Sequence, residues 1–153
     1  MTWPAADEPA HATERTRAII RAFLARVAEG DAEHIAALFA DQIDWRIAPN
    51  PAAPWIRPRA TPADAAGHFR DLAAGVIPDP QRARTDTVIA DGVHGVITGL
   101  LAGSVRATGK TYSSPFAVHF IVENDLITGF HVYEDSLAIA EACTPYTDPS
   151  DRP

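Results

Sequence analysis

Runs of alternating apolar and polar residues fill the last third of the chain, and they constrain its fold more than any other feature. Alternation with a period of two is typical of β-strands that bury one face. The last three runs are joined by short turns, at Gly109-Lys110 and at Asn124-Asp125, and short turns connect strands of opposite direction. We therefore predict an antiparallel sheet. Its four strands span residues 84–90, 93–108, 115–123 and 127–134.

The first third of the chain carries a helical pattern. Apolar residues recur at spacings of three and four from residue 13 onward, which indicates an amphipathic helix with one buried stripe. This stripe consists of Ile19, Ile20, Phe23, Leu24 and Val27. Gly30 ends the helix, and Asp31 is a natural N-cap for a second one. The second helix turns Ile35, Leu38 and Phe39 inward.

A strand, a proline-rich loop and a third helix follow. Residues 43–47 alternate and predict a half-buried strand, whereas residues 48–62 contain five prolines and indicate a rigid loop. Thr61 and Pro62 then start a helix that runs to about residue 72, and Asp135 caps a short closing helix over 137–142. Helices that precede a meander of strands predict an α+β fold with the helices on one face of the sheet.

The chain length of 153 residues suits one domain. We expect this domain over residues 13–142. The segment 1–12 lacks periodicity and predicts a flexible arm, and the segment 143–153 is rich in proline and aspartate and predicts a flexible tail.

Charge and cysteine content exclude several function classes. The net charge of −7 argues against nucleic-acid and membrane partners, because both need a basic protein surface. Cys143 is the only cysteine, so an intrachain disulfide and a cysteine-ligated zinc site are excluded. The first ten residues lack the pattern of a signal peptide, and we expect a cytoplasmic protein. Phosphate-binding and dinucleotide-binding motifs are absent, and no cofactor is expected.

Three segments resemble a known superfamily. They are FLARVAEGDAEHIAALFAD at 23–41, TGKTYSSPFAVHFIVEND at 108–125 and ITGFHVYEDSLAIAEA at 127–142. They resemble the nuclear transport factor 2-like superfamily, and within it the SnoaL-like polyketide cyclases and the ketosteroid-isomerase-like proteins. The resemblance implies a cone: a strongly curved antiparallel sheet, closed by N-terminal helices around an internal pocket. It also implies a homodimer that packs the outer sheet faces together.

The resemblance also locates the catalytic positions of these relatives. The tyrosine, the aspartate base and the protonated aspartate of ketosteroid isomerases fall on Phe23, Ile47 and Val118. A histidine of SnoaL-like cyclases falls near Val118, and an acid that these cyclases share with limonene-epoxide hydrolases falls near Val132. All four residues are apolar here. Hydrocarbon side chains can neither take up a proton nor stabilise an enolate, so we expect no ketosteroid isomerase activity.

Strand alternation selects the side chains that face the predicted pocket. The expected lining residues are Phe23, Trp45, Ile47, Trp55, Gly99, Leu101, Gly103, Phe116, Val118, Phe120, Phe130 and Val132. Glu134 is the one acid on the same face, and an apolar setting would raise its pKa toward the range that suits acid–base catalysis. Alternatively, the strand has left the pocket at Glu134, which then meets solvent or an arginine. Gly99 and Gly103 either hollow out the pocket or mark bends in the sheet.

Two further groups of residues are candidates for binding. Trp55, Arg57 and Arg59 lie on the proline-rich loop and can form a lid, or the arginines are ordinary solvated surface. His94, His119 and His131 are expected on the outer sheet face, where they fit a dimer interface as neutral side chains. Their spacing matches no metal motif, so no metal site is predicted.

Two functions stay open at this point. The first is a cofactor-independent enzyme, a cyclase, isomerase or dehydratase, that acts on a largely apolar polyketide or terpenoid-type molecule with Glu134 as the catalytic residue. The second is a non-catalytic binding or carrier protein with the same pocket. The apolar residues at the family's catalytic positions favour the second function, and the retained Glu134 favours the first.

Overall fold

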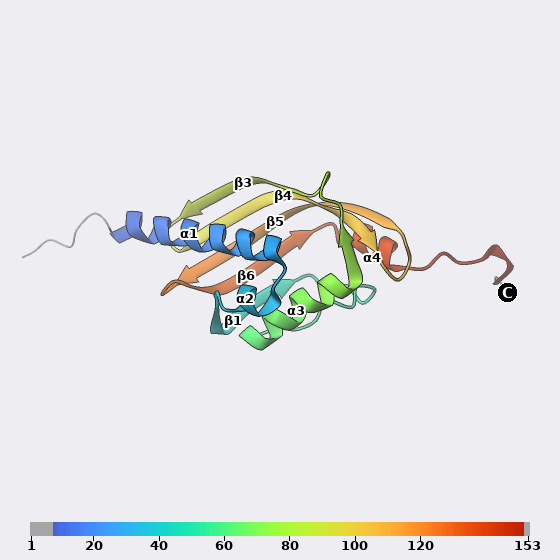
Figure 1. Cartoon of the computed structure of the whole chain (residues 1–153), viewed down its shortest axis with the longest axis horizontal. Coiled ribbons are helices and arrows are strands. Elements are labelled where there is room, and N and C mark those ends of the chain that lie inside the picture. The colour runs from blue at the N-terminus through green and yellow to red at the C-terminus, as the bar shows by residue number, and fades with distance from the viewer. Residues whose placement is uncertain (1–7, 152–153) are drawn as a thin grey trace, which may run out of the picture.

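A sheet of six strands curls beneath the helices of this chain (Figure 1). The computed structural model describes residues 8–151. The helices are α1 (Glu8–Glu29), α2 (Ala32–Ala36), α3 (Pro62–Gly75) and α4 (Ser136–Cys143), and a 3-10 turn, η1, covers Pro149–Asp151. The strands are β1 (Phe39–Ile47), β2 (Val76–Pro78), β3 (Arg84–Asp91), β4 (His94–Val105), β5 (Thr111–Glu123) and β6 (Leu126–Glu134).

The run of four antiparallel strands is confirmed, since β3 pairs with β4, β4 with β5 and β5 with β6, each in antiparallel orientation. The sheet as a whole is mixed, however, because β1 adds to β6 in parallel. The expectation of a purely antiparallel sheet needs this correction. Tight turns dictate opposite directions only between consecutive strands, whereas α3 and four strands separate β1 from its neighbour β6.

Several element boundaries differ from the predicted ones. The strand β1 begins at Phe39 instead of residue 43, so Phe39 lies in a strand and not in the second helix. The strand β5 begins at Thr111, ahead of Pro115, where the sequence pattern places its start. The pairing of β5 with β6 ends at Phe116, so β5 has only β4 beside it at Pro115. A strand with one partner tolerates proline.

The two chain ends differ from their predicted boundaries as well. The helix α1 begins at Glu8, so part of the predicted arm is helical, and residues 1–7 lie outside the described residues. The helix α4 extends to Cys143, and the turn η1 lies within the predicted tail. Flexibility of the tail stays a prediction.

Side-chain caps fix where the predicted helices begin. Asp31 accepts a hydrogen bond from the backbone of His34 and starts α2, and Asp135 accepts one from Ala138 and starts α4. Thr61 and Asp64 cap each other's backbone N–H groups at the start of α3. Such caps each stabilise a helix by about 1 kcal/mol. The helix α3 packs against α2 and β1.

An aromatic core joins the helices to the inner face of the sheet. Phe23 on α1 contacts the rings of Phe39, Phe69, Phe120 and Phe130 at centroid distances of 5.1–6.4 Å. Offset and edge-on ring pairs contribute about 1 kcal/mol each beyond their burial. A second, smaller cluster forms where the proline-rich loop meets β2, β4 and α4, and it consists of Ala53, Trp55, Val76, Val105, Ile139 and Ala142.

Gly99 and Gly103 allow close approach of neighbouring strands. A Cβ atom on Gly99 would collide with the backbone oxygen of Arg84 on β3, and one on Gly103 with that of Ile77 on β2. The pairing of β3 with β4 also shifts register next to Gly99, between Thr85 and Thr87. Of the two roles considered for these glycines, the contacts support bends in a curved sheet.

We predict that Gly99→Ala lowers the free energy of unfolding by about 1–3 kcal/mol, because a rigid backbone would have to move. Chemical denaturation measures the change. Thr98→Ala is the matched control: it changes the half-buried neighbour of Gly99 on β4 and adds no atom. The control should stay within about 1 kcal/mol of the wild type. Equal effects of the two substitutions would contradict the assignment.

Candidate functional site

A cleft of about 320 Å³ opens between the end of β1 and the proline-rich loop. Its lining is mostly apolar and comprises Trp45, Ile47, Pro49, Asn50, Pro51, Ile56, Arg57 and Pro58. Asn50 is buried and donates a hydrogen bond from Nδ2 to the carbonyl oxygen of Ser136 at 2.9 Å. This bond ties the loop to the start of α4, just beyond the end of β6. The cleft therefore adjoins the inner sheet face at the predicted pocket residues Trp45 and Ile47.

The backbone carbonyl group of Trp55, on the proline-rich loop, accepts hydrogen bonds from two side chains. The Trp55 ring is 6% exposed and packs in the second cluster, so it is part of the core rather than a lid. The Trp55 backbone oxygen accepts hydrogen bonds from Nη2 of Arg59 at 3.3 Å and from Nδ1 of His68 at 3.1 Å. Arg59 is almost fully buried and pairs with Asp71 at 2.8 Å, which lowers the pKa of the Asp71 carboxyl. Only Arg57 of the predicted lid residues lines the cleft.

His68 on α3 is a buried histidine at this site that the sequence analysis misses. Burial lowers its pKa to about 4, so the ring is neutral near pH 7. A carbonyl oxygen only accepts, so the ring proton lies on Nδ1 and the lone pair lies on Nε2. Nε2 makes no hydrogen bond with any residue in the range 8–151. The signal for His68 is its place in a helical apolar stripe with Ala65, Phe69 and Leu72.

Trp45 on β1 forms the wall between the cleft and the aromatic core. Its ring lies 4.6 Å from that of Phe130 and 5.0 Å from that of His68, measured between centroids. The indole Nε1 is completely buried and has no hydrogen-bond partner among residues 8–151. A buried N–H group without a partner is costly, by about 1–3 kcal/mol, and calls for an explanation.

Glu134, the predicted catalytic acid, ends β6 on the helix-covered face. It lies opposite Phe116, which packs against the aromatic core, and residues opposite each other in a sheet project to the same face. Burial raises the pKa of the Glu134 carboxyl, and no residue in the range 8–151 forms a hydrogen bond or ion pair with it. Glu134 does not line the cleft itself; Ile47 does, and Ile47 pairs with Val132, two residues before Glu134.

The other predicted lining residues lie behind Trp45. Phe23, Val118 and Phe120 are buried, and Phe116, Phe130 and Val132 pack against the same cluster. Leu101 on β4 is half-buried and pairs with Ser114. Apart from Leu101, these residues belong to the same core cluster, against which Trp45 packs. Open space is found at its edge, beside Trp45 and Ile47.

A sequence comparison identifies the family, and structure comparisons show the same fold. The sequence model of the SnoaL-like domain matches residues 20–130. The chain belongs to the SnoaL-like domain family. An NTF2-like protein from Burkholderia xenovorans LB400 has a similar crystal structure, with a TM-score of 0.75 and 24% identity. That likeness covers 86% of this chain and 98% of the other. No curated protein matches the sequence.

Two further crystal structures resemble this SnoaL-like domain. A protein from Xanthomonas campestris pv. campestris, provisionally named a polyketide cyclase, has a TM-score of 0.68 and 15% identity, over 87% of this chain and 99% of the other. A protein from Bacillus subtilis, provisionally named an isomerase, has a TM-score of 0.69 and 18% identity, over 86% of this chain and 94% of the other. At such low identity these likenesses show the fold alone.

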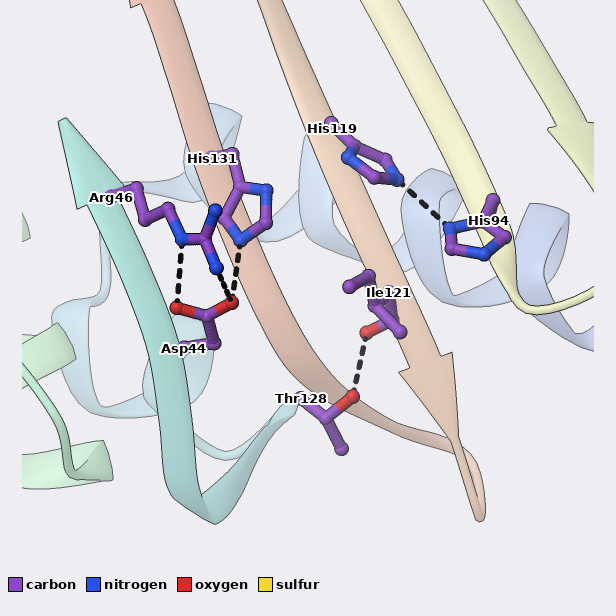
Figure 2. Close-up of polar contacts among 7 residues, drawn as sticks. All are labelled: Asp44, Arg46, His94, His119, Ile121, Thr128 and His131. Carbon is purple, nitrogen blue, oxygen red and sulfur yellow. Dashed lines mark hydrogen bonds and ion pairs between the residues drawn. The ribbon is translucent and has the colours of Figure 1, made fainter.

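The outer face of the SnoaL-like domain carries a string of polar side chains across four strands, shown in Figure 2. Asp44 on β1 pairs with Nε and Nη2 of Arg46 at 3.0 and 2.9 Å and contacts Nε2 of His131 on β6 at 3.0 Å. Nε2 of His119 on β5 lies 2.9 Å from Nδ1 of His94 on β4. Hydrogen bonds from Arg46 and His131 lower the pKa of Asp44, and burial beside His131 and His94 lowers the pKa of His119.

The domain offers no metal centre or membrane helix within its described part. Among residues 8–151, no group of three or more histidine, cysteine, aspartate or glutamate side chains can hold a metal ion. None of the helices in the same range is long and apolar enough to cross a membrane.

We predict that His68 makes the SnoaL-like domain less stable in acid. The unfolded chain takes up a proton at this side chain near pH 6.5, whereas the folded protein does so only near pH 4. Unfolding is therefore favoured progressively as the pH falls from 6.5 to 4, by about 3 kcal/mol in total. The variant His68→Asn keeps a donor for the Trp55 carbonyl group and does not titrate.

Urea denaturation at a series of pH values tests this expectation. The lowered pKa of His119 acts in the same direction, so the difference between wild type and His68→Asn isolates the contribution of His68. The unfolding free energy of the variant should fall less steeply between pH 6.5 and 4. Parallel curves for the two proteins would show that His68 does not titrate as assigned.

Proposed function

We propose that this SnoaL-like protein binds a largely apolar small molecule at the cleft beside Trp45 and rearranges it without a cofactor. The reaction is a cyclisation, isomerisation or dehydration in which Glu134 moves a proton. The observation that carries the proposal is the Glu134 carboxyl group, which faces the aromatic side of the sheet without a hydrogen bond or ion pair from residues 8–151.

The setting of Glu134 suits proton transfer. Burial disfavours the carboxylate and raises the pKa of Glu134, so the group holds its proton nearer to neutral pH than an exposed glutamate does. Such a carboxyl group can protonate an oxygen of the substrate and then accept a proton from carbon, which is general acid–base catalysis. An ion pair would abolish this capacity, because a nearby cation stabilises the carboxylate.

The lining of the cleft supports the substrate class. Prolines and aliphatic side chains surround Trp45 there, and Arg57 is the one charged residue in the lining. Apolar clefts bind ligands by removing hydrocarbon surface from water, at about 25 cal/mol per Å². The names of the Xanthomonas and Bacillus proteins, a polyketide cyclase and an isomerase, agree with this class of reaction.

A non-catalytic binding protein is the second candidate function. Two observations favour it: Glu134 does not line the cleft, and apolar residues occupy the positions where relatives carry catalytic groups. In that case Glu134 is a partly buried acid near the binding site, and the ligand leaves unchanged.

We predict that Glu134→Gln lowers turnover about 10²- to 10⁴-fold on the substrates that the wild type converts, because the amide keeps the shape and cannot transfer a proton. The assay follows dehydration and isomerisation of a panel of cyclic β-hydroxyketones. Glu123→Gln, at an exposed glutamate on β5, is the matched control and should retain full activity. Full activity of Glu134→Gln would refute the catalytic role, and a wild type without activity on the panel would favour the binding protein.

We also propose a homodimer through the outer sheet face. This face carries Val96, Leu100, Ala102, Ala117, Ile121 and Tyr133. Ala102 is buried within the single chain, the other aliphatic residues are half-buried, and Tyr133 is 61% exposed. His119 and His131 lie among them, and a neutral His119 fits a contact that excludes water. Monomers rarely expose contiguous apolar patches of this kind.

Sedimentation velocity at micromolar concentration should therefore give a dimer. Tyr133→Arg should convert the dimer to a monomer. The substitution places a guanidinium group from each protomer in the interface, where the two groups repel each other or lose their hydration. Tyr146→Arg, at an 80% exposed residue after α4, is the control and should leave the dimer intact. A monomeric wild type would exclude the proposed assembly.

A further inference from the structure

Trp45, which lines the cleft, and its neighbour His68 each carry a polar atom without a partner among residues 8–151. The Trp45 Nε1–H group is buried and donates to no residue in the range 8–151, and His68 Nε2 carries a lone pair that no described residue uses. The centroids of the two rings are 5.0 Å apart. One group is a pure donor, and the other is a pure acceptor in this tautomer. A hydroxyl group is the simplest partner for both, since its oxygen accepts and its hydrogen donates.

We infer that Trp45 and His68 bind a hydroxyl group of the ligand. The indole Nε1–H donates to the hydroxyl oxygen, and the hydroxyl hydrogen is donated to His68 Nε2. The inference rests on the proposed function and narrows its substrate class to largely apolar alcohols, enols or phenols.

Other polar groups fit this pair less well. A ketone or ether oxygen accepts from Trp45 but directs its own lone pairs at the lone pair of His68. A carboxylate has no proton to donate to His68 Nε2, and it would lose its water beside the aromatic rings. An ammonium group has no acceptor to match the indole N–H. Of these ligand groups, only the hydroxyl group satisfies both atoms.

The surroundings fix the position of His68. The Trp55 carbonyl group accepts from Nδ1 of His68 and thereby fixes the position of the lone pair on Nε2. The same carbonyl group and Asp71 hold Arg59, so the loop and α3 act as one support. Trp45 packs against Phe130 on one side and lines the cleft on the other. Because Nε1 is buried in this structure, binding of the hydroxyl group requires the Trp45 ring to turn toward the cleft that it lines.

Calorimetric titration with two matched probes tests the inference. The probes are 2-naphthol and 2-methoxynaphthalene, which share a ring system, and only the naphthol donates a hydrogen bond. Burial alone favours the methyl ether, because it carries one more apolar carbon. A hydroxyl site reverses the order, and the wild type should bind the naphthol about tenfold more tightly.

Two variants remove one hydrogen bond each. Trp45→Phe retains an aromatic ring without the N–H group, and His68→Asn keeps the bond to the Trp55 carbonyl group without an acceptor at the place of Nε2. Each variant should lose the preference for the naphthol and bind both probes within about twofold. His34→Asn, at an exposed histidine of α2, is the control and should keep the tenfold preference.

The possible results distinguish failure of the hydroxyl site alone from failure of the proposed apolar ligand as well. Equal binding of the two probes by the wild type, or a preference that survives in both variants, overturns the hydroxyl site and leaves the apolar cleft in place. Failure of both probes to bind overturns the hydroxyl site together with the proposed apolar ligand. The role of Glu134 is unaffected by any of these results, since it is measured separately with Glu134→Gln.

Discussion

The packing of Phe23 is the contact on which the rest of the structure depends. Its ring meets Phe39 on β1, Phe69 on α3, Phe120 on β5 and Phe130 on β6. One side chain of α1 thus joins a helix and three strands that are distant in the sequence. Because interiors are packed as densely as organic crystals, these rings fix one another's positions. The bends at Gly99 and Gly103 let the sheet curve around this aromatic core.

This aromatic centre also determines where polar chemistry can occur. The resemblance to ketosteroid isomerases places a tyrosine where Phe23 stands, and an acid near Val118. With hydrocarbon at both positions, the middle of the cone becomes core. Polar groups are left at its edge: Trp45 and His68 beside the proline-rich loop, and Glu134 at the end of β6. The family fold is retained while the polar groups lie elsewhere, as is expected when sites vary on a common scaffold.

The sequence predicts those features that depend on local patterns. Alternation identified β3 to β6, and cap residues identified the starts of α2, α3 and α4, because both signals reside in neighbouring residues. The parallel pairing of β1 with β6 depends on a long crossover and leaves no local trace.

The burial of the Trp55 side chain likewise depends on a distant residue. Gly75 has no side chain, and this leaves room for the Trp55 ring. Glu134 could be selected because alternation assigns its face. His68 could not, because one histidine in an apolar stripe of a helix shows neither its bond to the Trp55 carbonyl group nor its nearness to Trp45.

Burial shifts the pKa values of His68 and Glu134 in opposite directions for one reason. It disfavours the cationic form and lowers the pKa of His68, and it disfavours the anionic form and raises the pKa of Glu134. Both groups are thereby driven toward their neutral forms. A site of this kind offers hydrogen bonds in place of fixed charges, which suits an uncharged ligand.

The same argument limits the chemistry that Glu134 can perform. A proton given up by a buried carboxyl group leaves an anion that no residue in the range 8–151 pairs with. Positive charge that develops on the substrate in the same step stabilises such an anion, as in acid-catalysed loss of a hydroxyl group. Proton transfer from Glu134 is therefore favoured with a substrate that develops this charge.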